Sequence, residues 1–381
     1  MIKNTLPPLS LYIHMPWCIK KCPYCDFNSH TLKNEMPEME YIEALLKDLQ
    51  YSLPQVDHRP LHSIFFGGGT PSLFSATSLN ILLEKINTYI PFTPDMEITL
   101  ETNPGTVEHK NFNDYKSAGI TRISLGAQSF QDEKLKALGR IHNAAEIKKA
   151  IQKIQAANFA SFNIDVMYGL PHQSVSDALY DINTALAFSP PHISWYNLTI
   201  EPNTLFFHQT PPLPLEDSVM EIFEVGMKTL QEAYQHYEVS AFAKPLHQCA
   251  HNVNYWQFGD YIGIGAGAHG KITHKDFKTI TRTQKIRHPK NYLQAATHDI
   301  TTTTAITEKD IAFEFMLNAL RLIEGFPLSL FEQRTNLSLQ SIATPLSLAQ
   351  EKGFITLNNE FLQLTKQGKY FLNDVMQLFL P

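Results

Sequence analysis

Three of the four cysteines, Cys18, Cys22 and Cys25, stand close together in the spacing C-x3-C-x2-C. A tetrahedral zinc site or a cubane iron–sulfur cluster normally takes four protein ligands, so one ligand is missing from this motif. The spacing alone leaves both kinds of site open. The residues that could complete a zinc site are His14, His30, Asp26 and the distant Cys249.

A glycine triplet lies in the segment FFGGGTP, residues 65–71, directly after an apolar run. Three glycines let the backbone approach a ligand closely, and their N–H and C=O groups can hold charged atoms. The segment lacks the Lys-Ser/Thr pair of a phosphate-binding loop and the G-x-G-x-x-G dinucleotide motif. By itself, such a triplet is more often a tight turn than a binding site.

Composition limits the class of protein. The chain has 381 residues, of which 43% are hydrophobic, and a net charge of 31 − 37 = −6. This balance does not favour nucleic acid as a partner. No stretch of about 18 apolar residues predicts a membrane-spanning helix. The start of the chain lacks an apolar signal region, and the cysteines do not form a disulfide framework, so we expect a cytoplasmic location.

Apolar runs alternate with helical patterns along the first part of the chain. The predicted strands are 11–15, 62–66, 96–101, 122–128, 161–168 and 192–198. The helical spacings between or after them cover 42–49, 79–86, 147–154 and 219–230. This alternation predicts parallel α/β structure. We expect a partial (β/α)6 barrel over residues 1–240, with a doubly wound open sheet as the alternative.

Three predicted strands each carry one polar face. Glu97, Thr99 and Glu101 alternate with apolar residues, as do Arg122, Ser124 and Gln128, and then Asn163 and Asp165. Parallel strands buried on both faces usually read as continuous apolar runs. The inner surface is therefore expected to surround something polar, although buried structural hydrogen bonds would give the same pattern. Ligand groups of such barrels gather at the carboxyl ends of the strands, where Glu101 and Gln128 stand.

The alternation of strands and helices stops near residue 240. Residues 241–305 are expected to be an irregular extension, and residues 306–381 a mainly helical, winged-helix-like domain with a hairpin around residues 358–359. The predicted wing carries little positive charge. This favours a packing or substrate-covering domain over DNA binding.

Six ordered motifs within residues 10 to about 270 resemble one family. They are YIHMPWCIKKCPYCDFNSH, FFGGGTPS, ETNPGT, SLGAQSF, the Arg140 of ALGR, and NIDVMYGLPHQ. This set is similar to the radical S-adenosylmethionine (SAM) superfamily, in the branch of the oxygen-independent coproporphyrinogen III dehydrogenases. Within that branch, HNVNYW at 251–256 resembles the signature of the HemW-type heme chaperones.

The resemblance implies a [4Fe–4S] cluster on Cys18, Cys22 and Cys25, whose fourth iron is left open for the amino and carboxylate groups of SAM. It also implies the SAM-binding positions, which are Tyr12, the backbone near Tyr24, Gly68, Gly69, Thr70, Glu101, Gln128, Arg140 and Asp165. Arg140 would pair with the carboxylate of SAM, and Gln128 and Asp165 with its ribose hydroxyls. The polar strand faces select Glu101, Gln128 and Asp165 independently. Arg140 has no such support, and a surface salt bridge is its alternative.

One departure from the branch separates two functions. The coproporphyrinogen dehydrogenases have a fourth cysteine two residues after the third, where this chain has Phe27. This favours a chaperone that binds heme and delivers it to respiratory enzymes at the membrane. The alternatives are a radical SAM oxidoreductase acting on coproporphyrinogen III or another tetrapyrrole, and a zinc-stabilised winged-helix regulator.

The resemblance leaves the details of heme handling open. His251 opens the signature and is the candidate heme ligand, with a structural hydrogen bond as its alternative. No catalytic residue is assigned, and coproporphyrinogen dehydrogenase activity is not expected. The expected partners are heme as cargo and respiratory heme-acceptor proteins. A peripheral position at the membrane and a homodimer stay open.

Overall fold

The computed structural model describes residues 5–106, 111–358 and 360–381, and one large sheet organises most of them. Six adjacent strands at its centre are parallel and follow the order of the chain. They are β1 (Leu9–Met15), β4 (Leu61–Gly68), β5 (Phe92–Thr102), β6 (Arg122–Gln128), β7 (Ser161–Tyr168) and β8 (His192–Asn197). The six predicted strands are thus confirmed.

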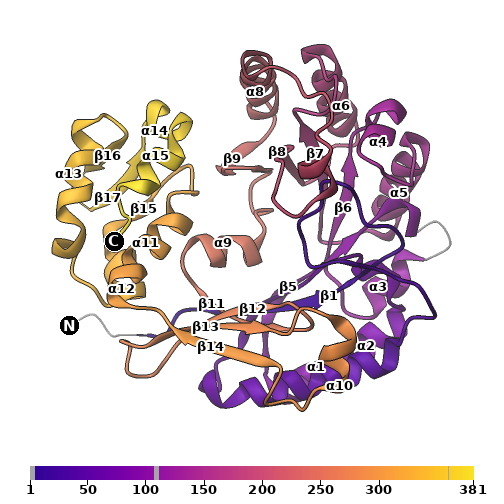
Figure 1. Cartoon of the computed structure of the whole chain (residues 1–381), viewed down its shortest axis with the longest axis horizontal. Coiled ribbons are helices and arrows are strands. Elements are labelled where there is room, and N and C mark those ends of the chain that lie inside the picture. Colours follow the sequence, from indigo (N-terminus) through magenta and orange to yellow (C-terminus); the bar gives the residue numbers. More distant parts are fainter. Residues whose placement is uncertain (1–4, 107–110, 359) are drawn as a thin grey trace.

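Helices cover the outer side of these strands in an arc (Figure 1). They are α1 (Glu38–Ser52), α2 (Ala76–Tyr89), α3 (Phe112–Ser117), α4 (Asp132–Ala137), α5 (Ala144–Ala157), α6 (Val175–Ala187) and α8 (Glu216–Gln231). The largest apolar core fills the space between the helices and the sheet. Leu11, Ile64 and Leu100 contribute to it from the strands, and Ile42 and Ile147 from the helices.

Local signals explain where these helices begin. Asn143 and Glu146 form a reciprocal capping box at the start of α5, and Ser174 and Asp177 do the same for α6. These side chains satisfy N–H groups that have no partner within the helix. Helix α5 stops at Asn158, which adopts the left-handed conformation common after a helix end.

The inner side of the sheet is polar, as the sequence predicts. Ser10, Ser63, Thr99, Ser124 and Asn163 are all buried there. Their neighbours along each strand point to the outer helices. Successive side chains of a strand point to opposite faces, so the pattern of polar residues in the sequence fixes which face encloses the site.

Both edges of the sheet carry further strands. Beyond β8 lie β10 (Ala241–Ala243) and β9 (Gln235–Glu238); beyond β1 lie β11 (Asp260–Ile264), β12 (His269–Thr273), β13 (Ile280–Lys285) and β14 (Thr301–Ala305). The expectation that 241–305 is irregular is therefore wrong. Strand β11 pairs with β1, which lies far away in the sequence, and the polar runs of β13 and β14 lack the apolar alternation of a half-buried strand. The boundaries at 240 and 305 stay a prediction.

The C-terminal part has the predicted winged-helix-like pattern. Its elements are α11 (Glu308–Ala319), β15 (Phe326–Pro327), α12 (Leu328–Thr335), α13 (Ala343–Glu351), β16 (Ile355–Asn358), β17 (Phe361–Leu364), α14 (Lys366–Tyr370) and α15 (Leu372–Gln377). Strands β16 and β17 pair antiparallel, so the hairpin is confirmed, although residue 359 at its turn lies outside the described residues. A second apolar core holds this part together. In the described ranges, no helix is long and apolar enough to cross a membrane.

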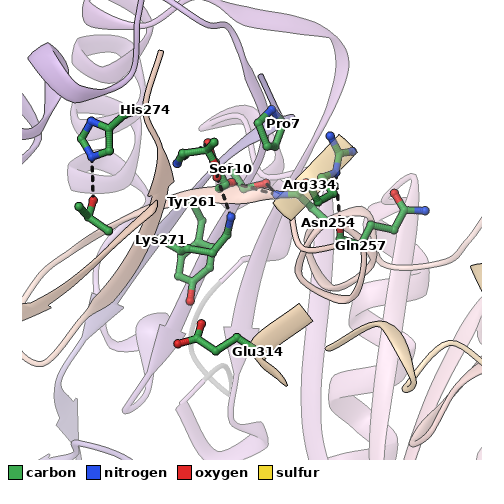
Figure 2. Close-up of polar contacts among 12 residues, drawn as sticks. Pro7, Ser10, Asn254, Gln257, Tyr261, Lys271, His274, Glu314 and Arg334 are labelled. Carbon is green, nitrogen blue, oxygen red and sulfur yellow. Dashed lines mark hydrogen bonds and ion pairs between the residues drawn. The ribbon is translucent and has the colours of Figure 1, made fainter. Parts of the chain in front are cut away.

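A short helix inside the arc joins the two parts. Helix α9 (Ala250–Trp256) holds the HNVNYW segment and lies within the concave side of the sheet (Figure 1). Figure 2 shows Asn254 of α9 directed at Ser10 of β1, and Arg334 of α12 directed at Gln257. The side chain of Arg321, which follows α11, lies 4.3 Å from the ring of Trp256. The C-terminal part is thus attached through α9.

A buried ionic cluster stands beside this joint. Asp260 on β11 is fully buried and accepts hydrogen bonds from Arg59 at 2.7 Å and Lys271 at 2.8 Å. The backbone and side chain of Thr273 bond to the same carboxylate. The ring of Phe258 packs against the Lys271 ammonium, at 4.2 Å. The cluster fixes β11 and β12 beside the first strand.

We expect Asp260→Asn to lower the free energy of unfolding by about 3–5 kcal/mol, because the buried Lys271 ammonium loses its counter-charge. Chemical denaturation checks this value. Asp217→Asn, on the exposed start of α8, is the control and should cost about 0.5 kcal/mol or less. Equal stability of the two variants would mean that the cluster does not stabilise the fold.

Candidate functional site

The three clustered cysteines follow the carboxyl end of β1: Cys18 ends the short strand β2 (Trp17–Cys18), and Cys22 and Cys25 lie on the loop after it. The backbone N–H of Cys25 donates to the carbonyl of Cys22 at 3.1 Å, which folds the loop back on itself. The hydroxyl of Thr70 lies 3.4 Å from Cys18 Sγ, and Arg140 Nη1 lies 3.5 Å from Cys22 Sγ. Ser29 Oγ lies 3.7 Å from Cys25 Sγ. Each thiol therefore has a polar neighbour that could support a thiolate.

The electrostatics of the loop fit a bound cationic group. Burial raises the pKa of Cys18, and the neighbouring Cys25 and Cys22 raise it further. Burial also raises the pKa of Cys25. Over residues 5–106, 111–358 and 360–381, no three His, Cys, Asp or Glu side chains converge on one metal-ion position. The backbone hydrogen bond from Cys25 to Cys22 keeps these two residues within one tight turn, and iron would deprotonate the thiols on binding.

Three of the four candidates for a fourth ligand are engaged elsewhere. Both ring nitrogens of His14 are hydrogen-bonded, to the Tyr12 hydroxyl at 2.9 Å and to the Asn28 carbonyl at 2.8 Å. His30 bonds to the side chain of Asn28. Cys249 contacts Glu97 at 3.4 Å. Glu97 stands four residues before Glu101 on β5, which places this contact about 13 Å along the strand from the carboxyl end.

The glycine triplet packs directly on the cysteine loop. The backbone N–H of Gly69 donates to the Met15 carbonyl at 2.7 Å, and that of Thr70 to the Trp17 carbonyl at 2.8 Å. A Cβ at Gly69 would lie 2.6 Å from the Trp17 carbonyl oxygen. Gly68 has φ +109°, and a Cβ there would meet the His14 ring at 2.5 Å. Side chains at these positions would push the two loops apart.

Glu101 and Asp165 place acidic groups on the inner wall beside these loops. Glu101 accepts a hydrogen bond from the Gly68 N–H at 3.3 Å. Burial raises its pKa to about 8, and the nearby Asp165 adds to this rise. Burial also raises the pKa of Asp165, although the hydrogen bonds from Asn163 at 2.7 Å and Ser124 at 3.3 Å oppose it. Such a wall would favour a cationic ligand.

Tyr12 borders the same space from β1. Its ring stacks on Phe65 at 6.4 Å, and burial together with Glu101 raises the pKa of its hydroxyl. The hydroxyl proton is therefore retained, and Tyr12 can act as a neutral hydrogen-bonding group.

Gln128 reaches the site through an irregularity in the sheet. The pairing of β6 with β7 shifts between Gly126 and Gln128, and Gln128 has φ +72°, a value rare for residues other than glycine. Its side-chain oxygen accepts a hydrogen bond from the Tyr196 hydroxyl at 2.8 Å. Such bulges often redirect a side chain. Alternation placed Gln128 on the polar face but did not predict the bulge.

Arg140 lies inside the site and forms no surface salt bridge with any residue that the structure describes. It follows α4, and its Nη2 donates to the Gly126 carbonyl at 2.8 Å. Its Nη1 lies 3.5 Å from the Tyr24 hydroxyl as well as from Cys22. Its buried Nε has no hydrogen-bond partner among the described residues, so one donor stays available. The side chain of Tyr24, and not only its backbone, thus takes part in the site.

His251 on α9 is buried behind this wall. It is 1% exposed, and Phe65 and Tyr255 pack against its ring at 5.1 and 4.7 Å. Its Nδ1 forms a hydrogen bond with Ser63 at 2.9 Å, while its Nε2 has no partner within residues 5–106, 111–358 and 360–381. Burial lowers its pKa to about 3, so the imidazole is neutral at physiological pH.

Sequence reasoning missed two residues that shape the site. Glu97 accepts hydrogen bonds from the backbone N–H groups of Ala250 and His251, both at 3.2 Å, and so holds the start of α9. Tyr196 positions Gln128. The polar and apolar alternation noted in β5, β6 and β7 also holds in β8, where it would have placed Tyr196 on the inner face. No pattern in the sequence links Glu97 to α9.

Comparisons with known proteins identify the class of both parts of the chain. Residues 12–184 match the model of the radical SAM superfamily, and residues 306–371 match that of the HemN C-terminal domain. The solved structure of coproporphyrinogen III oxidase (HemN) from Escherichia coli superposes with a TM-score of 0.83 at 22% identity, covering 99% of this chain and 91% of that one. The chain thus has the HemN-like radical SAM fold.

Relatives that match over their full length show which family within the radical SAM superfamily the chain belongs to. The protein named Heme chaperone HemW of Haemophilus influenzae is 52% identical, with 98% of both chains covered. The HemW proteins of Escherichia coli and Bacillus subtilis are 50% and 32% identical, covering 98% and 97% of this chain and 99% of each relative. The chain belongs to the HemW family of the radical SAM superfamily.

We expect Cys22→Ala to abolish assembly of a [4Fe–4S] cluster without unfolding the protein, because Cys22 lies on a loop outside the apolar cores. Iron and sulfide analysis after anaerobic reconstitution measures the first effect, and circular dichroism the second. Cys249→Ala removes a thiol distant from the loop and should retain the cluster. A full cluster in the Cys22 variant would rule out this ligand set.

The raised pKa of Glu101 predicts a pH-dependent stability. Between pH 4.5 and about 8, the folded, ligand-free chain holds a proton that the unfolded chain has released, so stability falls as the pH rises through this range. Glu101→Gln removes this pH-dependent loss of stability, because glutamine does not titrate. We expect its stability relative to the unsubstituted protein to increase by about 2–4 kcal/mol from pH 5 to pH 8 in thermal or denaturant unfolding. A pH-independent difference would contradict the raised pKa.

Proposed function

We propose that this chain is a heme chaperone that carries a SAM-ligated [4Fe–4S] cluster and delivers heme to respiratory enzymes at the membrane. The observation that carries the proposal is the full-length similarity to proteins named Heme chaperone HemW. The cysteine loop supports the cluster, and the acidic side chains of Glu101 and Asp165 support a cationic ligand such as SAM. Cytoplasmic location with peripheral contact at the membrane belongs to the same proposal.

The site residues have distinct tasks in this proposal. Cys18, Cys22 and Cys25 hold three irons of the cluster, and the two loops held together at Gly69 and Thr70 keep the cluster beside SAM. Glu101 and the glycine backbone receive the SAM ammonium, and Arg140 its carboxylate. Gln128 and Asp165 bind the ribose hydroxyls. With SAM bound, the reduced cluster could supply the electron that cleaves the S–C5′ bond.

An oxidoreductase acting on coproporphyrinogen III or another tetrapyrrole is the second candidate. The proposed SAM-binding residues are compatible with it, since the same residues would serve either activity. Phe27 opposes it. This side chain occupies the position of the additional cysteine of the dehydrogenases, and it is 60% exposed on the cysteine loop. We therefore rank the chaperone first.

His251 is the heme ligand that the family signature suggests. Its neutral ring is in the protonation state that binds iron. When its Nδ1–H donates to Ser63, the unpartnered Nε2 carries the free lone pair. Since the ring is buried between Phe65 and Tyr255, heme can reach it only after that packing opens.

Heme titration of the anaerobically reconstituted protein tests the function. We expect a saturable shift of the heme absorption band at near-stoichiometric ratio, stronger than with an unrelated control protein, and no turnover of coproporphyrinogen III. His251→Ala should reduce the shift if this residue is a ligand. Weak, unsaturable binding would contradict the chaperone, and SAM-dependent turnover would favour the oxidoreductase.

A further inference from the structure

Two large apolar side chains are exposed on the cysteine loop. Phe27 is 60% exposed and Ile19 is 48% exposed. Neither belongs to an apolar core of the described residues, and the tasks proposed for the site use neither of them. Single exposed apolar residues are ordinary on a protein surface, but a pair on a loop that carries a site indicates a contact surface.

Helix α7 (Leu205–His208) adds two more such side chains beside the loop. The N–H of Phe206 donates to the Pro23 carbonyl at 2.9 Å, so the helix begins against the loop. Leu205 and Phe207, on either side of Phe206, are 55% and 52% exposed. The cysteine loop is therefore bordered by exposed apolar groups from a segment that is distant in the sequence.

Lysines stand between the apolar groups of the loop itself. Lys20 and Lys21 follow Ile19 directly, and both are exposed. The Lys21 ammonium donates to the Phe27 carbonyl at 3.0 Å, which draws the two ends of the loop together. The loop thus presents apolar and cationic side chains on one short segment.

A second segment, directly after β13, brings further basic side chains to the loop. The side-chain amide of Asn28 donates to the Arg287 carbonyl at 2.8 Å. The ring centres of His30 and His288 lie 5.3 Å apart. Arg287 and His288 are both exposed. We call the surface that the two segments form the loop face; it consists of Ile19, Lys20, Lys21, Phe27, Arg287 and His288.

The loop face differs in charge from the protein as a whole. Lys20, Lys21 and Arg287 carry positive charges, which Asp26, the acidic residue of the loop, offsets only in part. The whole chain has a net charge of −6. A positive patch on an acidic protein turns that patch toward a negatively charged surface.

We propose that the loop face docks on an anionic lipid surface, with Phe27 and Ile19 inserted at the level of the headgroups and the basic side chains on the lipid phosphates. Lysine is depleted in protein–protein interfaces, whereas basic residues beside apolar ones are typical of contacts with membrane surfaces. The inference rests on the proposed function, in which heme reaches enzymes at the membrane. It places the cysteine loop, and not the C-terminal part, next to the lipid.

Co-sedimentation of the reconstituted holoprotein with vesicles tests the docking. We expect binding to vesicles of phosphatidylglycerol and phosphatidylcholine in equal parts, weaker binding at high salt, and little binding to phosphatidylcholine alone. Ile19→Ser/Phe27→Ser should weaken binding by about tenfold or more, because it removes the inserted groups. Lys20→Glu/Arg287→Glu should also weaken it by about tenfold or more, because each basic residue near an anionic surface contributes about fivefold.

Matched variants elsewhere on the surface are the controls. Tyr51→Ser/Tyr180→Ser removes side chains that are 44% and 48% exposed on α1 and α6. Lys47→Glu/Lys85→Glu reverses two exposed charges on α1 and α2. Both controls should bind vesicles as the unsubstituted protein does. Iron and sulfide content and thermal unfolding establish that each variant is folded and loaded.

Hydrogen exchange locates the contact without any substitution. Anionic vesicles should slow the exchange of backbone amides in residues 19–28 and 286–288 of the unsubstituted holoprotein. Exchange in α5, on the outer layer, should stay the same. Protection confined to other segments would contradict docking through the loop face.

The outcomes separate the docking surface from the function. If the unsubstituted protein does not bind anionic vesicles, or the loop-face variants bind them equally well, the docking proposal fails, while heme titration in solution still decides the chaperone function. Loss of binding in the charge variant alone would exclude insertion and favour an acidic protein as the partner. Variants that lose the vesicles but take up heme saturably would support the docking. Vesicle binding without saturable heme binding would refute the chaperone function alone.

Discussion

The need to pair buried polar groups on the inner face of the sheet constrains this structure more than any single contact. Asp165 is bonded to Asn163, whose oxygen bonds to His192 at 2.7 Å. His192 bonds to Tyr237 at 2.8 Å, and the Tyr237 hydroxyl accepts the N–H of Cys249, the residue before α9. An unpaired buried polar group costs about 1–3 kcal/mol. One hydrogen-bond network therefore fixes Asp165 on the inner face of the sheet and the start of α9 together.

The HNVNYW helix is as much a structural joint as a ligand candidate. Glu97 holds its first N–H groups, and Asn254 ties it to β1 at 2.9 Å. From the other side, Arg321 lies against Trp256 and Arg334 donates to the Gln257 carbonyl at 3.2 Å. These contacts, together with the Glu238–Arg321 and Arg282–Glu314 ion pairs, hold the C-terminal part against the sheet. A signature read only as a metal-ligand motif would overlook this role.

Features encoded within short segments were predictable from the sequence. The alternation in β5, β6 and β7 predicted the polar inner face, including Glu101 and Asp165, and the helical spacings predicted the outer layer. Features that depend on distant pairing were not. Strand β11 finds its partner in β1, about 250 residues earlier, and its short sequence carries no sign of this. The bulge at Gln128 is likewise set by the register with β7. The roles of the site residues still rest on the family motifs.

The site contains more acidic groups than a ligand-free protein can ionise favourably. Burial raises the pKa values of Glu101, Cys18 and Cys25, so protons occupy positions that positive charge could fill, and burial also raises the pKa of Asp165. Iron on the thiols and the ammonium and sulfonium groups of SAM would displace those protons. Arg140, between Cys22 and the Gly126 carbonyl, supplies a fixed cation where the cysteine loop meets the inner face of the sheet. In the proposed function, the cysteine loop and the glycine segment that packs on it hold both the cluster and SAM. Binding of either group should therefore favour binding of the other, because each stabilises the fold that the other requires.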